Sequence, residues 1–145
     1  MWVRGERLRI DKDVYKYIEF EMRHYNEYKK EIKNIREEIL EGSPEPPDGQ
    51  PRSNRAGNPT ENKAVKLSMS ISLKSMEALV KAVDKAMELL TDRHKRIFEM
   101  VYIHNRRDRY NMSDELHVSY ETFNNNKNEI VLAVGRELGA IKNIF

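Results

Sequence analysis

Residues 106–135, RRDRYNMSDELHVSYETFNNNKNEIVLAVG, carry the pattern that decides the expected fold. A short, weakly apolar segment (111–116) is followed by a turn (117–119) and then by a longer segment. Ser119 stands where its hydroxyl can cap the first backbone amides of that longer segment. The spacing of its apolar residues places them on one face of a helix. They are Phe123, Ile130, Val131, Val134, Leu138 and Ile141. The stretch therefore predicts two helices joined by a tight turn.

Two helices arranged in this way are the outline of a helix-turn-helix, in which the second helix enters the major groove of DNA. Polar residues occupy the second predicted helix, opposite its apolar stripe. We expect the helix that begins near Tyr120 to read DNA. The expected DNA-contacting residues are Ser119, Tyr120, Glu121, Thr122, Asn124, Asn125, Lys127 and Asn128, together with Arg106, Arg107 and Arg109 ahead of the first helix.

Each residue type suggests a role. An asparagine amide can pair with the adenine edge, and a good bidentate pair discriminates by about 1–3 kcal/mol. Asn124, Asn125 and Asn128 are therefore expected base readers. Lys127 and the three arginines are expected to meet phosphates, which positions a protein without reading sequence. The competing interpretations are a polar surface helix for the asparagines and a solvated loop for the arginines.

A helical pattern also precedes this stretch. Thr91 and Asp92 can cap a helix whose apolar face includes Ile97, Phe98 and Val101. Before it, Pro59 suits a first helical position, with Asn58 as the expected N-cap, and apolar residues recur at helical spacing to Leu90. Residues 68–73 alternate with period two, but we interpret them as helical or kinked because their flanks are helical.

The N-terminal segment predicts one long helix. Asp11 or Asp13 can cap its start, and Gly42 ends it. Its apolar residues lie three and four apart, and its other face is dense with charge, as at a coiled-coil seam. Residues 14–39 are therefore expected either to self-associate into a homo-oligomer or to pack on their own chain.

Composition restricts the classes of function. All five prolines lie within residues 43–59, which predicts a flexible linker. The net charge is only +2, so DNA binding has to depend on local patches. The chain has no cysteine, and its four histidines show no metal-ligand spacing, so we expect no metal and no cofactor. No apolar run is long enough for a membrane span, and no signal peptide is recognisable, so a cytoplasmic location is expected.

These features predict an all-α protein in three parts. Residues 1–42 are expected to form a helical arm, residues 43–58 a linker, and residues 59–145 a helical DNA-binding domain with the helix-turn-helix at about 106–135. No phosphate-binding loop, zinc-protease motif or catalytic triad order is recognisable. We therefore expect no enzymatic activity.

The order of the motifs resembles a known family. Leu90-Thr91-Asp92-Arg93, Ile97-Phe98 and Tyr102, followed by Leu116-His117-Val118-Ser119 and Thr122-Phe123, are similar to region 4 of bacterial sigma factors. With the tyrosine-rich N-terminal helix, the proline-rich linker and Thr60-Glu61-Asn62-Lys63-Ala64-Val65, the chain resembles RinA/ArpU-type phage transcriptional regulators. Asn126 stands where such recognition helices usually carry an aliphatic residue.

The resemblance implies a transcriptional activator of phage late genes in a bacterial host. Its partners would be double-stranded DNA and host RNA polymerase. Two alternatives stay open: a DNA-packaging component such as a small terminase subunit, and a helical module that binds only protein. A ring of many subunits would favour packaging. The absence of any salt-dependent DNA affinity would favour protein binding, because phosphate contacts release counterions.

Overall fold

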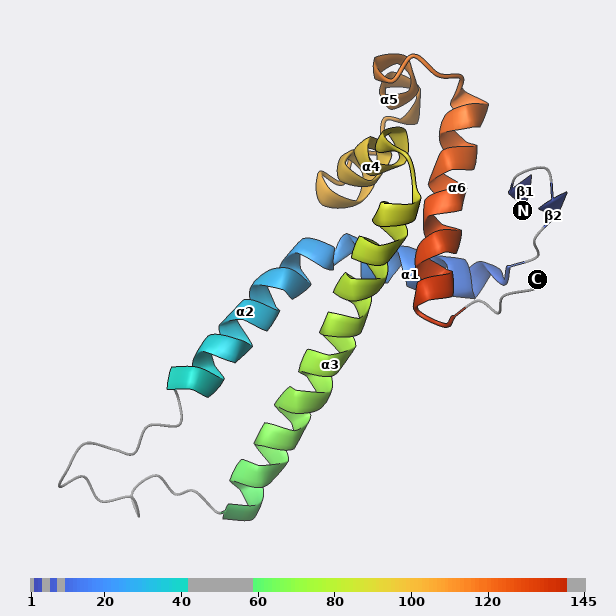
Figure 1. Cartoon of the computed structure of the whole chain (residues 1–145). Helices are drawn as coiled ribbons and strands as arrows, with labels where there is room; N and C mark the ends of the chain where they lie inside the picture. Colours follow the sequence, from blue (N-terminus) through green and yellow to red (C-terminus); the bar gives the residue numbers. More distant parts are fainter. Residues whose placement is uncertain (1, 4–5, 8–9, 42–58, 141–145) are drawn as a thin grey trace. The chain divides into compact units, whose positions relative to one another are not determined.

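The computed structural model describes residues 2–3, 6–7, 10–41 and 59–140 (Figure 1). Apart from two antiparallel two-residue strands, β1 (Trp2–Val3) and β2 (Glu6–Arg7), the regular elements in these ranges are helices, which confirms the predicted all-α class. The helices are α1 (Lys12–Arg23), α2 (Tyr25–Glu41), α3 (Pro59–Leu89), α4 (Asp92–Phe98), the π-helix η2 (Glu99–Ile103), α5 (Arg109–Glu115) and α6 (Tyr120–Glu137).

The chain divides into two compact units, and the boundaries differ from the predicted ones. One unit comprises Met1–Asn26 and Ala78–Phe145, and the other comprises Glu27–Glu77. The N-terminal helix α1 therefore does not belong to a separate arm. The reason is chemical: polar groups of α1 bind polar groups of α6, as described below. The predicted linker, residues 43–58, lies outside the described ranges.

The predicted single helix up to Gly42 is interrupted at His24. In a continuous helix the carbonyl of Phe20 would accept from the His24 backbone amide. Here the imidazole Nδ1 of His24 contacts that carbonyl at 2.7 Å, and the His24 backbone amide donates to the Glu21 carbonyl instead. The side chain thus replaces a main-chain hydrogen bond, and α1 ends at Arg23.

Predicted helix caps are found at Asp11 and Thr91, whereas the first helix of the motif begins at Arg109 and not at Asn111. Asp11 caps α1 by accepting from the Asp13 amide at 2.8 Å. Thr91 and His94 form a reciprocal capping box at the start of α4. The alternating stretch at residues 68–73 is helical, because α3 runs without interruption from Pro59. The predicted N-cap Asn58 lies outside the described ranges.

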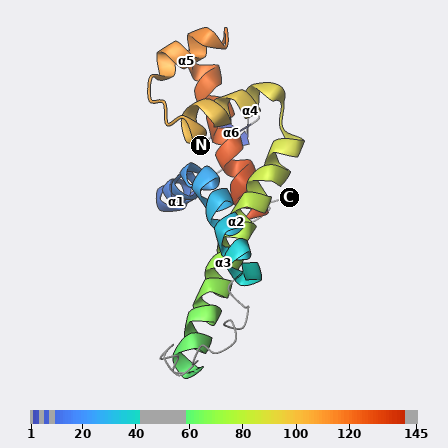
Figure 2. The same ribbon diagram turned by 90° about the vertical axis from the view of Figure 1, so that its left-hand side faces the viewer.

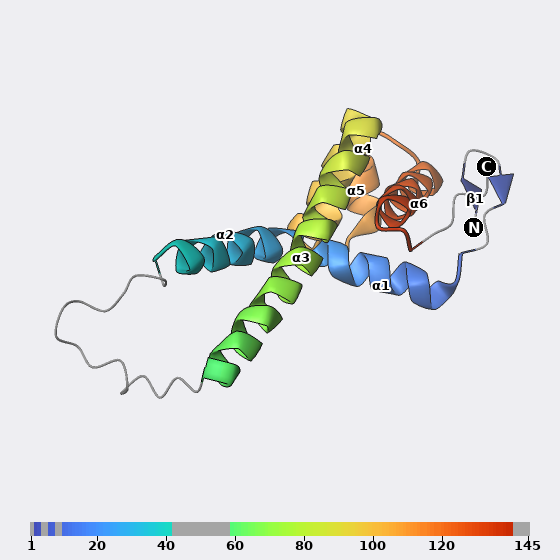
Figure 3. The same cartoon turned by 60° about the horizontal axis from the view of Figure 1, so that its bottom comes forward.

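The core of the first unit is formed by the inner faces of α1, α3, α4, η2, α5 and α6. Its fully buried large side chains are Ile18, Met22, Leu79, Val83, Ile97, Tyr102, Met112, Phe123, Ile130, Val131, Leu132 and Val134. Within this unit α1 lies across α6, as Figures 1 and 3 show from two directions. This crossing determines which part of α6 is covered.

The second unit contains the remainder of α2 and the first part of α3. Ile35 of α2 is buried, and the Arg36 guanidinium pairs with Glu77 Oε1 of α3 at 2.5 Å. On α3, Leu67 and Ile71 are exposed. Self-association through residues 14–39 stays a prediction.

Candidate nucleic-acid interface

Helix α5, a turn and the start of α6 lie together at one end of the first unit (Figures 1 and 2). The turn is closed by backbone hydrogen bonds from His117 to Asp114 and from Val118 to Ser113, at 3.1 and 3.0 Å. His117 has a φ of 57°, a left-handed conformation that is uncommon outside glycine. Two helices are thus joined by a short, hydrogen-bonded turn, as the sequence predicts.

The first turn of α6 is fixed by a side-chain cap. Ser119 Oγ accepts from the Thr122 amide at 3.0 Å, and the two hydroxyls lie 2.9 Å apart. One turn further, Phe123 is fully buried, so the rotation of the helix about its own axis is set. That rotation leaves Glu121 and Asn125 exposed.

A polar and aromatic cluster connects the start of α5 to the first two turns of α6. The Arg109 guanidinium donates to Asn124 Oδ1 at 3.4 Å. The rings of Tyr110 and Tyr120 stack with centroids 4.2 Å apart and planes 14° from parallel. Tyr110 is 69% exposed and Tyr120 is 36% exposed. Hydrogen bonds from Asn124 and Arg109 lower the pKa of Tyr120.

Two predicted DNA contacts point away from the exposed face of α6. Lys127 was expected to meet phosphate, but its relative exposure is only 7%, and its ammonium group lies 3.1 Å from Glu19 Oε2 on α1. Asn128 was expected to read a base, but its Oδ1 accepts from the Tyr15 hydroxyl of α1 at 2.7 Å. The outward orientation predicted for both residues is therefore wrong, because α1 crosses α6 at this level.

The contacts of Lys127 form a half-buried polar network. Glu19 Oε2 also accepts from the Tyr102 hydroxyl at 2.7 Å, and the Lys127 ammonium lies 5.8 Å from the centroid of the Tyr15 ring. Burial lowers the pKa of Lys127, while Glu19 opposes that shift. Burial also raises the pKa of Tyr15 and Tyr102. The network joins α1, η2 and α6 and leaves Lys127 no surface for DNA.

The three arginines at and before the start of α5 differ in their surroundings. Arg106 binds Asp108 through two guanidinium nitrogens, at 3.1 and 2.6 Å, and Glu115 at 2.5 Å. These bonds raise the pKa of Arg106 and lower that of Asp108 to about 2. The positive charge of Arg106 is thus already balanced within the protein. Arg107 and Arg109 are exposed and better suited to meet phosphate.

Behind the exposed face, Asn126 takes part in a second polar group. Its Nδ2 donates to Glu129 Oε1 at 3.0 Å, and the same oxygen lies 3.6 Å from Nε2 of the buried His94 on α4. His94 Nδ1 accepts from the Thr91 amide at 3.2 Å. Asn126 therefore connects to α4 through Glu129, at a position where an aliphatic residue would make only apolar contacts.

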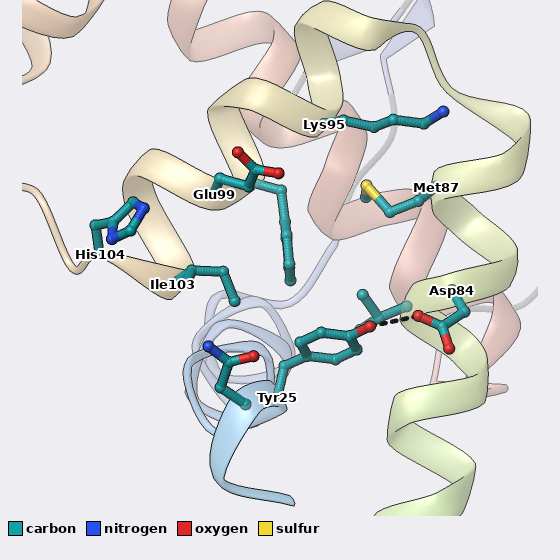
Figure 4. A pocket seen from close by; sticks show the side chains of 10 residues that line it. Tyr25, Asp84, Met87, Lys95, Glu99, Ile103 and His104 are labelled. Atoms are coloured by element: carbon teal, nitrogen blue, oxygen red, sulfur yellow. Dashed lines mark hydrogen bonds between the residues drawn. The ribbon is translucent and has the colours of Figure 1, made fainter. Parts of the chain in front are cut away.

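An open hollow of about 410 Å³ lies between α3, α4, η2 and the start of α2 (Figure 4). The Tyr25 hydroxyl donates to Asp84 at its edge, and Lys95, Glu99 and His104 also line it. Within the described ranges, no three acidic or histidine side chains are grouped closely enough to hold a metal ion. None of the described helices is long and apolar enough to cross a membrane.

The predicted site residues thus fall into two groups. The structure brings Arg109 together with the polar start of α6, and it separates Lys127, Asn128 and the internally paired Arg106 from that surface. Tyr110 and Glu19 were not among the site residues predicted from the sequence. No local signal indicates Glu19, because its partner lies more than a hundred residues away in the chain. The gathered surface, which we call the α6 face, consists of Arg109, Tyr110, Ser119, Tyr120, Glu121, Thr122, Asn124 and Asn125.

Comparison with known proteins gives one match. Neither the curated proteins nor the solved structures contain a match to the chain. The family model described as "Protein of unknown function (DUF722)" matches residues 15–135, which include α1 from Tyr15 onward and α6 up to Gly135. The matched range thus holds both helices that build the network and the whole α6 face. The chain belongs to the DUF722 family.

Proposed function

We propose that this protein is a sequence-specific DNA-binding regulator in which α5, the turn and α6 act as a helix-turn-helix. The observation that carries the proposal is the α6 face: exposed and half-buried hydrogen-bonding side chains at the starts of α5 and α6, where the rotation of α6 is fixed by buried Phe123. Such a face can enter a major groove, which admits one helix and presents a distinct pattern of donors and acceptors for each base pair.

The crossing of α1 limits how much of α6 could reach base edges. At Lys127 and Asn128 the helix turns its polar groups toward α1. The part of α6 that can reach base edges is therefore its first two turns, where Glu121, Asn124 and Asn125 are the proposed base readers. The N-terminal residues of a recognition helix contact bases in known helix-turn-helix complexes, so this length is sufficient.

The charge distribution predicts modest non-specific affinity. Residues 92–145 contain nine Lys or Arg and eight Asp or Glu. Arg106 and Lys127 are paired inside the protein, which leaves Arg109 of the α6 face and the exposed Arg107 as the proposed phosphate contacts. Each phosphate that the protein neutralises adds about 0.9 to the salt slope, which is the decrease of log affinity with log salt concentration. Specificity would then depend on the polar readers rather than on bulk charge.

The proposed biological role is activation of phage late genes, which rests on the order of sigma-region-4-like motifs in the sequence. Thr91, Ser119 and Thr122 of those motifs make the cap bonds described above. Contact with host RNA polymerase and self-association of the N-terminal segment belong to the same proposal.

The test is selection of bound fragments from the source genome by purified full-length protein, with affinity measured across salt. We expect enrichment upstream of one operon. Enrichment at the site where DNA packaging starts, together with a ring-shaped oligomer, would support a role in packaging and not in regulation. No enrichment and no salt slope would overturn DNA binding.

The variant that tests base reading is Asn125→Ala, because Asn125 is exposed and its side chain makes no hydrogen bond to the residues that the structure describes. This variant should bind the selected fragment about tenfold more weakly than wild type, as expected for the loss of one base contact. It should leave affinity for unrelated DNA unchanged. Equal weakening of both would show that Asn125 does not read sequence.

A further inference from the structure

We propose that the cluster of Arg109, Tyr110, Tyr120 and Asn124 is a preassembled reader of guanine, in which Arg109 fixes the amide of Asn124 so that it presents a donor. The inference rests on the proposed function. It changes the expected base from the adenine that a free asparagine would favour, and it gives Arg109 a positioning role beyond phosphate contact.

The orientation of the Asn124 amide follows from the chemistry of its partner. A guanidinium group carries five N–H donors and no acceptor. The amide atom that faces Arg109 at 3.4 Å must therefore be the oxygen, Oδ1. With Oδ1 turned toward Arg109, the Nδ2 donors are the part of the amide left to face a base, whereas the bidentate adenine contact also needs the oxygen to accept from the adenine amino group.

Tyr120 adds a further donor to the same cluster. Its side chain is 36% exposed, and Asn124 and Arg109 both lower the pKa of its phenol. With the Asn124 oxygen turned toward Arg109, the cluster can offer outward the Asn124 Nδ2 hydrogens, the Tyr120 O–H and the unused N–H groups of Arg109. The groups that it presents are therefore mainly donors.

A surface of donors fits one major-groove edge best. Guanine presents two acceptors there, N7 and O6, whereas adenine presents one acceptor and one donor, cytosine presents a donor, and thymine presents one acceptor beside its methyl group. Adenine and cytosine would bring their amino groups against donors of the cluster. Guanine therefore accepts hydrogen bonds from more donors of the cluster than the other bases do.

Tyr110 keeps this arrangement in place. Its ring stacks on Tyr120 at 4.2 Å and 14°, and an offset or stacked aromatic pair contributes about 0.5–1.5 kcal/mol beyond its buried area. Both rings stand at helix starts, so the stack fixes the distance between Arg109 and Asn124. An unsupported pair of exposed side chains would sample many rotamers instead.

The experiment is selection from a duplex library with a randomised centre, using full-length wild type and the variants Asn124→Ala, Arg109→Met and Arg107→Met. The position that loses its preference in Asn124→Ala identifies the base pair read by Asn124. We expect guanine there in wild type, and about tenfold weaker binding when that guanine is replaced by 7-deazaguanine, which lacks the N7 acceptor.

The arginine variants test the positioning role. Arg109→Met frees Asn124 Oδ1, so the preference should move from guanine toward adenine, and the salt slope should fall by about 0.9. Arg107→Met should lower the salt slope similarly without changing the preferred base. Adenine in wild type, or an unchanged preference in Arg109→Met, would overturn the inference and leave DNA binding standing. A wild type that selects no sequence would overturn the proposed function as well.

Discussion

Replacement of Lys127 by methionine separates a structural lysine from a DNA-binding one. The ammonium of Lys127 lies 3.1 Å from Glu19, and the two side chains are 9% and 17% exposed. Methionine has a similar length and can fill the same space, so the variant removes the charge with little change of volume. Glu19 then retains only the Tyr102 hydroxyl as a described partner within the network.

The expected cost follows from the burial of that carboxylate. Removing one partner of a fully buried ion pair costs about 3–5 kcal/mol, since the other charge is left uncompensated. The partial exposure of Glu19 allows water to reach it, which reduces the cost to about 2–4 kcal/mol. The double variant Lys127→Met/Glu19→Gln carries no charge here and keeps an acceptor for Tyr102, so it should recover most of the loss.

Urea denaturation of wild type, the two single variants and the double variant gives the coupling free energy of the pair. The salt dependence of DNA affinity is measured on the same proteins. Lys127→Met should leave the salt slope unchanged, because a buried ammonium neutralises no phosphate. A variant as stable as wild type with a slope lower by about 0.9 would refute the buried pair and restore Lys127 as a phosphate contact.

Other residues give further predictions. Thr91→Ala removes the cap of α4 and should lower the free energy of unfolding by about 0.5–2 kcal/mol in urea, with Thr91→Ser close to wild type; an unchanged Thr91→Ala would mean that the capping box adds no stability. Burial raises the pKa of Tyr102, so its contribution is complete below about pH 10, where the unfolded phenol titrates, and is lost at higher pH. Stability should therefore fall above about pH 10, less steeply in Tyr102→Phe, and equal slopes would contradict this. Arg106→Ala should lower the salt slope of DNA binding less than Arg107→Ala, because Arg106 is already paired, and the reverse order would show that its ion pairs open on DNA.

Local signals in the sequence were sufficient to predict the residues that cap three of the helices. Asp11, Thr91 and Ser119 are each found as the capping residue of the helix they were expected to begin. A cap depends on a side chain and an amide two or three residues away, so the pattern contains the whole interaction. The break at His24 is also local, but helical periodicity continues across it and hides it.

Contacts between distant segments could not be predicted from the sequence in the same way. Lys127 and Asn128 have the polarity of surface residues, and polarity alone places them outside. Their burial depends on Glu19 and Tyr15, which approach only because α1 crosses α6. The same limit applies to the candidate site: the asparagine-rich start of α6 was visible in the sequence, but the stacking of Tyr110 on Tyr120 was not.

The attachment of α1 to α6 also explains why the N-terminal segment cannot be regarded as an appendage to a complete DNA-binding domain. Glu19 and Tyr15 satisfy an ammonium and an amide that would otherwise be half-buried without partners, which is costly in a low-dielectric interior. The same contacts hold the rotation of α6, and that rotation decides which side chains form the α6 face. A reader of base edges has to be held rigidly by the residues around it. In this fold α1 supplies part of that support, so we expect any selection of bases at the start of α6 to depend on Tyr15 and Glu19 of α1.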